Sequence, residues 1–135
     1  MYTYITKELP ELVEKYFHVA SGVRSITGHS MGGNGALVIA ARNPENYRSV
    51  SAFAPICTSS NPEKRFGSTA MKTYFSNNPE LAKRYDCVEV INTVKHLPVG
   101  LVDYGTHDEY TKIMEPQLLI NALGNGGHSN VTFRW

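Results

Sequence analysis

One short segment, Gly28-His29-Ser30-Met31-Gly32, constrains the fold of this chain more than any other. A β-like run, Val23 to Thr27, precedes it, and an alanine-rich apolar segment, Asn34 to Arg42, follows it. A strand, a Gly-x-Ser-x-Gly turn and a buried helix in this order are typical of a nucleophile elbow, where the serine stands on a strained turn at the carboxyl end of a strand. We therefore expect Ser30 to be a nucleophile, with strands and helices alternating around it.

The residues next to Ser30 have roles of their own in such a turn. Gly28 and Gly32 are expected to be glycine because side chains there would clash with the flanking strand and helix, and Gly33 gives further room. The backbone N–H of Met31 lies at the helix N-terminus, where it can donate to a carbonyl oxygen that becomes negative. Met31 is thus the predicted oxyanion-hole residue.

Helical spacing of apolar residues predicts further helices. In residues 4–17 the spacing is interrupted by Pro10, which indicates either a kink or a true start near Leu9. Residues 66–86 are expected to hold one or two short helices, and residues 115–123 another. The last two lie between strand-like runs, so helices are expected to connect the strands.

Continuous apolar runs predict the remaining strands, at residues 49–54, 97–104 and 131–135. Runs of this kind are typical of parallel strands covered on both faces. The helix after the elbow should end before Pro44, because the residue before a proline avoids the α region. The predicted fold class is α/β: a partial α/β-hydrolase fold with a parallel sheet of about four strands and flanking helices. We expect residues 1–135 to form a single, incomplete domain of this kind.

Composition and charge exclude several other classes. The 13 Lys and Arg against 12 Asp and Glu give a net charge of +1, and no basic run with interleaved aromatics is present, so no nucleic-acid partner is expected. The longest apolar stretch, Ala36 to Ala41, is too short to span a membrane. Cys57 and Cys87 make neither a disulfide framework nor a zinc-ligand set, which favours free thiols in the cytoplasm and no metal.

A serine nucleophile needs a base that is oriented by an acid, and in this architecture the acid follows the serine in the chain. The acid should lie in a loop after a later strand. The loop after residues 97–104 offers Asp108, which is the predicted acid. Asp103, still within the strand run, and Glu109, its neighbour, are the alternatives.

The base should be a histidine after Asp108, in a loop beyond the last strand. Only His128 lies downstream, but it precedes the strand at residues 131–135 and would lie at the wrong end of the sheet. The other histidines do not fit the expected chain order: His18, His29, His96 and His107. We therefore expect no catalytic histidine in this chain.

Several segments together resemble the S-formylglutathione hydrolase (esterase D) family. The resemblance covers residues 1 to 110 well and the remainder weakly, and the most specific segment is Ser-Val-Ser-Ala-Phe-Ala-Pro-Ile-Cys, which ends at Cys57. The similar segments are 1–4, 8–12, 25–33, 43–57, 66–67 and 103–108.

This resemblance implies a cytosolic serine thioesterase that cleaves S-formylglutathione to formate and glutathione, a step of formaldehyde catabolism, without metal or cofactor. It places the nucleophile on Ser30 and the acid on Asp108, with Met31 as one oxyanion donor. It also implies a small-molecule thioester or ester as the partner, and a homodimer for an intact family member.

The family's histidine belongs to an Asp-His-Ser-Tyr-Tyr-like segment, which aligns beyond Trp135, and its second oxyanion donor precedes Met1. We therefore expect this chain to correspond to one part of the family's fold and to be inactive by itself. Two alternatives stay open: a general short-chain carboxylesterase, since the same elbow serves both, and a non-catalytic fragment or interaction partner.

Overall fold

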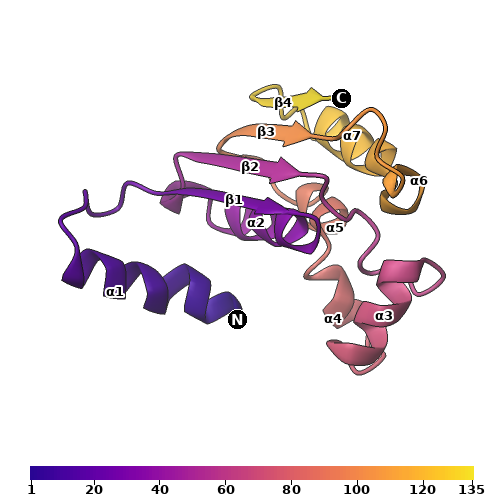
Figure 1. The fold of residues 1–135 in the computed structure, drawn as a ribbon, viewed down its shortest axis with the longest axis horizontal. Helices are drawn as coiled ribbons and strands as arrows, with labels where there is room; N and C mark the ends of the chain where they lie inside the picture. The colour runs from indigo at the N-terminus through magenta and orange to yellow at the C-terminus, as the bar shows by residue number, and fades with distance from the viewer.

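A computed structural model describes residues 1–135 and contains one parallel sheet. Its strands are β1 (Ser25–His29), β2 (Ser49–Phe53), β3 (Val99–Asp103) and β4 (Val131–Arg134). They pair in the order β1-β2-β3-β4, all parallel, so their carboxyl ends lie together (Figure 1). The predicted α/β class with a four-stranded parallel sheet is confirmed.

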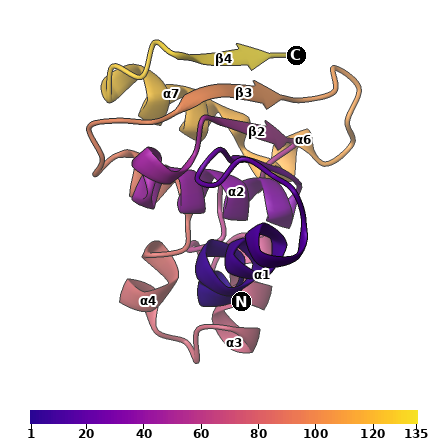
Figure 2. The ribbon, with the colours of Figure 1, turned by 90° about the vertical axis from the view of Figure 1, so that its left-hand side faces the viewer.

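The helices connect these strands and lie mainly on one side of the sheet (Figures 1 and 2). A π-helical turn and a 3₁₀ turn accompany them, and α3 and α4 lie farthest from the strands. In chain order they are η1 (Tyr4–Glu8), α1 (Leu9–Tyr16), α2 (Met31–Arg42), η2 (Pro44–Asn46), α3 (Arg65–Thr73), α4 (Pro79–Lys83), α5 (Cys87–Ile91), α6 (Thr111–Met114) and α7 (Pro116–Asn125).

The core lies between the sheet and helices α2, α5 and α7. Leu37 of α2, Val50 of β2, Ile91 of α5 and Leu119 of α7 are all buried in it. Val50 and Ala52 alternate along β2 with more exposed residues. The expectation that the strands are covered on both faces is thus wrong for these residues: the helices cover one face, and the other is largely polar.

The N-terminal helical segment changes from π-helical to α-helical geometry near Pro10. η1 ends at Glu8 and α1 begins at Leu9, and both residues keep helical backbone angles, so no new helix starts at the proline. No residue of α1 is buried. The helix is therefore not held by an apolar contact with the core.

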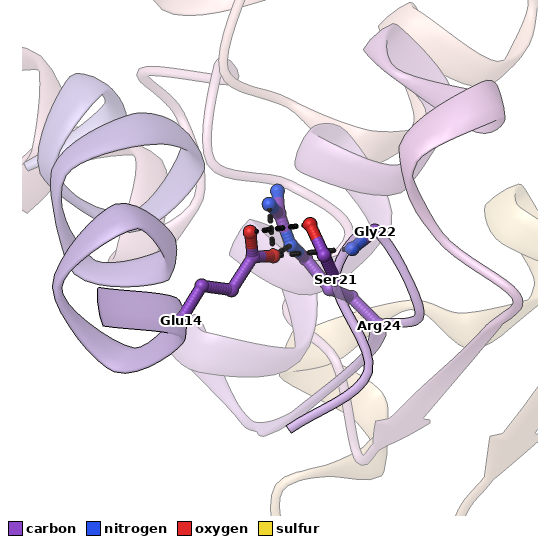
Figure 3. A network of polar contacts seen from close by, with 4 residues as sticks. All are labelled: Glu14, Ser21, Gly22 and Arg24. Carbon is purple, nitrogen blue, oxygen red and sulfur yellow. Dashed lines mark hydrogen bonds and ion pairs between the residues drawn. The ribbon is translucent and has the colours of Figure 1, made fainter. Parts of the chain in front are cut away.

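A polar network around Glu14 attaches α1 to the loop that leads into β1 (Figure 3). The Glu14 carboxylate accepts hydrogen bonds from Ser21 Oγ at 2.8 Å, the Gly22 N–H at 3.2 Å and Arg24 Nη2 at 2.6 Å. These bonds, the one from Arg24 first, lower the pKa of Glu14 to about 2. Charge and hydrogen bonding replace apolar burial at this end of the chain.

The remaining helices match the predictions in part. Two helices, α3 and α4, lie in the segment where one or two were expected, and α2 ends at Arg42, before Pro44. Helices α5 and α6 were not predicted. No helix is long and apolar enough to cross a membrane.

Candidate active site

Ser30 stands on a strained turn between β1 and α2. Its backbone angles, φ 56° and ψ −117°, lie in a region that residues with a side chain rarely adopt. β1 ends at His29 and α2 begins at Met31, so Ser30 is the single residue between strand and helix. The predicted elbow geometry is confirmed.

Close backbone contacts require glycine at position 28 and leave little room for a side chain at position 33. A Cβ on Gly28 would overlap the carbonyl oxygen of Gly32 and lie 2.9 Å from the Gly33 nitrogen. A Cβ on Gly33 would lie 3.1 Å from Pro55 Cα, in the loop after β2. A Cβ on Gly32 would meet no atom within 4 Å, so the expected clash at Gly32 is wrong.

Backbone hydrogen bonds hold the strained turn on two sides. The Ser30 N–H donates to Phe53 O at 2.9 Å, at the end of β2. The Ser30 carbonyl accepts from the Asn34 N–H of α2 at 3.1 Å and from the Ile56 N–H of the next loop at 3.2 Å. The loop after β2 therefore helps to fix the position of Ser30.

Met31 lies in the first turn of α2 with its side chain 63% exposed. Amides of the first helical turn have no acceptor within their own helix, and the helix dipole makes this end positive. An oxygen that develops negative charge beside Ser30 would meet such a donor. The role of Met31 as an oxyanion donor stays a prediction.

Asp108 lies at the same end of the sheet as Ser30. It belongs to the loop between β3 and α6, which follows the carboxyl end of β3 just as Ser30 follows that of β1. Its Oδ1 accepts a hydrogen bond from the Tyr110 N–H at 2.8 Å, and its own N–H donates to Gly105 O at 3.2 Å. The side chain is partly buried and held by its loop.

The two alternative acids are placed differently. Asp103, the last residue of β3, forms an ion pair with Arg134 of the neighbouring β4. Glu109 is exposed. A carboxylate that already has a cationic partner is less free to orient an imidazole, which favours Asp108.

His128 lies at the opposite, amino end of the sheet, just before β4. It is 5% exposed, and its backbone N–H donates to Leu123 O. The ring atom Nε2 is buried without a hydrogen-bond partner. A Cβ on Gly126 would lie only 2.5 Å from Nε2, so the ring packs against that glycine. The exclusion of His128 on the basis of chain order agrees with this position.

The other histidines do not complete a triad. His29 is exposed at the end of β1, and His107 is exposed with Nδ1 at 2.9 Å from Thr106 Oγ1. None of the five histidines is hydrogen-bonded to Ser30 or Asp108. No cluster of three or more His, Cys, Asp or Glu side chains suits a metal ion.

Tyr104 and Asn34 support the site, and the sequence analysis did not identify either of them. Tyr104, buried after β3, donates its hydroxyl to Pro55 O at 2.6 Å in the loop that contacts Ser30. The Asn34 carboxamide donates to Tyr85 O and accepts from the Cys87 N–H, both at 2.8 Å, and so joins α2 to α5. A polar residue inside an otherwise apolar helix was the available signal for Asn34.

Two pockets lie away from the elbow. One, of about 290 Å³, surrounds His128 between α7 and β4. The other, of about 360 Å³, is lined by α6, the start of α7 and Trp135. Neither is lined by Ser30 or Asp108.

Comparisons with known proteins identify the family and the fold. The family described as "Putative esterase" matches residues 1–129. The S-formylglutathione hydrolase of Paracoccus denitrificans is 40% identical over 123 residues, which are 91% of this chain and 43% of that protein. That of Bos taurus is 41% identical over 121 residues, covering 88% of this chain and 41% of the relative.

The solved structures show the same fold. An S-formylglutathione hydrolase from Agrobacterium tumefaciens has a TM-score of 0.84 and 34% identity, covering 98% of this chain and 47% of its own. Mycobacterium tuberculosis MPT51 has a TM-score of 0.74 at 20% identity, covering 99% of this chain and 58% of its own. At that identity it supports the fold alone. The chain thus spans less than half the length of these three S-formylglutathione hydrolases. Because the family match extends over nearly all of its residues, the chain belongs to this esterase family and is similar within it to the S-formylglutathione hydrolases.

Proposed function

We propose that this chain carries the nucleophile and the acid of a serine esterase that hydrolyses S-formylglutathione to formate and glutathione. The observation that carries the proposal is the strained backbone of Ser30 between β1 and α2. Strain of this kind is kept where a side chain must be exposed for reaction. The similarity to S-formylglutathione hydrolases supports the thioester as substrate.

In the proposed reaction Ser30 Oγ attacks the formyl carbonyl, and the sulfur of glutathione leaves. The Met31 N–H donates to the oxygen that becomes negative, where the N-terminus of α2 stabilises the charge. Asp108 orients the imidazole that takes the serine proton and returns it to the thiolate. Water then releases formate by the same route. On this proposal the reaction releases, as formate, a carbon that an earlier reaction has already oxidised from formaldehyde on glutathione; it takes place in the cytoplasm and uses no cofactor.

The imidazole is proposed to come from outside these 135 residues, which would form part of a single α/β-hydrolase domain. Support for this comes from His128, which is buried at the opposite end of the sheet from Ser30. Triad residues act as a unit, and the loss of one costs about 10⁴ to 10⁶ in rate. Without a second oxyanion donor the rate falls by roughly another 10² to 10³. We therefore expect the chain alone to be inactive.

The test compares the chain alone with a joined protein, in which the flanking segments of the Paracoccus denitrificans hydrolase extend it at both ends. S-formylglutathione is expected to be hydrolysed by the joined protein and to remain at background with the chain alone. Ser30→Ala should abolish turnover, and Ser129→Ala, an exposed serine at the amino end of the sheet, should not. Turnover by the chain alone that Ser30→Ala abolishes would show that one of its own histidines is the base.

The same proteins distinguish the thioesterase from a general carboxylesterase. A thioesterase of this type should turn over S-formylglutathione faster than a simple aryl acetate. If the joined protein hydrolysed the aryl acetate and left S-formylglutathione unchanged, the substrate assignment would be wrong while Ser30 kept its role.

A further inference from the structure

Cys57 and Cys87 are 30 positions apart in sequence and adjacent in the core. Cys57 lies in the loop after β2 and is 2% exposed, and Cys87 begins α5 and is fully buried. The Cys87 Sγ lies 3.6 Å from the carbonyl oxygen of Ile56, the residue before Cys57. The Cys57 side chain is also the first cause of the raised pKa of the Cys87 thiol, so the two side chains are neighbours in the core.

Each cysteine is one contact away from the elbow. Ile56, bonded to Cys57, donates its N–H to the Ser30 carbonyl at 3.2 Å. The Cys87 N–H donates to Asn34 Oδ1 at 2.8 Å, and the Asn34 N–H donates to the same Ser30 carbonyl at 3.1 Å. Each cysteine is therefore linked, through Ile56 or Asn34, to the carbonyl of Ser30.

The immediate surroundings place both thiols close to polar atoms and keep the Cys87 thiol protonated. The Cys57 Sγ lies 3.2 Å from the Tyr104 hydroxyl, which donates to Pro55 O at 2.6 Å. The hydrogen bond with Cys57, followed by burial, raises the pKa of the Cys87 thiol. Since the thiolate is the reactive form, oxidation in the folded chain should be slow at neutral pH and faster at higher pH.

We propose that Cys57 and Cys87 form a modification site, a buried dithiol that a small two-electron oxidant such as hydrogen peroxide closes to an intramolecular disulfide. One thiolate attacks a peroxide oxygen, gives a sulfenic acid and releases hydroxide, which takes up a proton to form water. The second thiolate attacks that sulfur, the S–S bond forms and the sulfenic oxygen leaves as a second water. In total the two thiols lose two electrons and two protons, and the peroxide is reduced to two waters.

The bridge would join the loop after β2 covalently to α5 and close the segment between them, which contains α3 and α4. A cross-link between those two elements would restrict the contacts of Ile56 and Asn34 with Ser30. Bridge formation does not depend on the proposed esterase function.

The test is intact-mass analysis of the folded 135-residue chain after hydrogen peroxide treatment, followed by denaturation and alkylation with N-ethylmaleimide. The untreated chain should take up two maleimides. The treated chain should take up none, weigh about 2 Da less than the reduced chain, and regain both thiols with dithiothreitol. Cys57→Ala and Cys87→Ala are the matched controls and should each retain one thiol without forming the internal bridge.

Three results would overturn the proposal. The first is a treated chain that keeps both thiols under conditions in which the urea-unfolded chain forms the bridge. The second is oxidation that adds oxygen atoms to the thiols, and the third is a disulfide between two copies of the chain. None of these three results depends on whether the variants fold, because each is obtained from the mass of the wild-type chain.

Hydrogen exchange then tests the link to the elbow. The Ile56 and Asn34 amides should exchange at least several-fold more slowly in the bridged chain than in the reduced chain. If these exchange rates were unchanged in a bridged chain, the disulfide site would stand, but its proposed effect on the contacts of Ser30 would be wrong. An inactive joined protein with a normal bridge would instead contradict the esterase proposal alone.

Discussion

The two ends of the parallel sheet differ in how they use polar residues. At the carboxyl end, Ser30 is held in a strained conformation and Asp108 lies in a loop at the same end. At the amino end, Glu14 and Arg24 attach a helix, and His128 is packed into the core. The polar groups at the carboxyl end stand where they can react, whereas those at the amino end are used in structure. A pattern of residue types alone does not separate the two uses.

The largest expected effect concerns the acid at the carboxyl end. In the joined protein, Asp108→Asn should lower kcat by about 10⁴, because an amide no longer holds the imidazole in the required tautomer. Asp103→Asn is the matched control, since Asp103 is paired with Arg134, and it should change kcat by less than about tenfold. Equal losses in the two variants would mean that Asp108 has no special role.

The elbow glycines offer a second comparison within the carboxyl end. Gly28→Ala should destabilise the chain by about 3 kcal/mol or more, because its Cβ would overlap the Gly32 carbonyl. Gly32→Ala has open space and should cost less than about 1 kcal/mol. Urea unfolding monitored by far-UV circular dichroism measures both. If the order were reversed, the contacts assigned to this turn would be wrong.

His128 tests the amino end by its effect on stability. His128→Ala should destabilise the chain by roughly 2 kcal/mol, because it leaves a cavity beside Gly126. His128→Leu fills the space and removes the unpartnered nitrogen, so it should restore most of that stability. In the joined protein kcat should be unchanged in both folded variants. A kcat that fell with either variant while the fold remained intact would make His128 part of the reaction.

The smallest expected effect is the pH dependence of the Glu14 network. Its pKa is about 2 in the folded chain against an ordinary 4.5, so its contribution is complete above pH 4.5 and is lost as the pH falls toward 2. Hydrogen exchange at the Gly22 amide should therefore speed up over that range, after correction for intrinsic rates. Glu14→Gln should flatten the change, and Glu11→Gln, exposed on the same helix, should not. No difference between these variants would exclude Glu14 as the cause.

The elbow could be predicted because its signal is local. A strand, two glycines around a serine and a buried helix are contiguous in the sequence, and Ser30 is the single residue between His29, which ends β1, and Met31, which begins α2. The parallel sheet could be predicted because strand-like and helix-like segments alternate along the sequence. The end of the sheet at which His128 lies could also be inferred, because it precedes a strand whose direction is fixed by the others.

The missed features depend on contacts between distant segments. Tyr104 supports the loop of Pro55 across 49 positions, and no pattern near Tyr104 indicates it. Helix α5 had a local signal that was overlooked: Asp86 caps it and Glu89 follows three residues later. The open space at Gly32 could not be predicted, since the spacing of the motif gives no information about what a side chain there would meet.

The most direct measurement of the central claim is labelling by a fluorophosphonate, which reacts covalently with activated serines. The joined protein should be labelled at Ser30, as identified by peptide mass spectrometry, and the chain alone should show background labelling. Ser30→Ala should remove the label from the joined protein, and Ser129→Ala should leave it. Labelling of the joined protein at any other serine, with Ser30 unmodified, would contradict the assignment of Ser30 as the nucleophile.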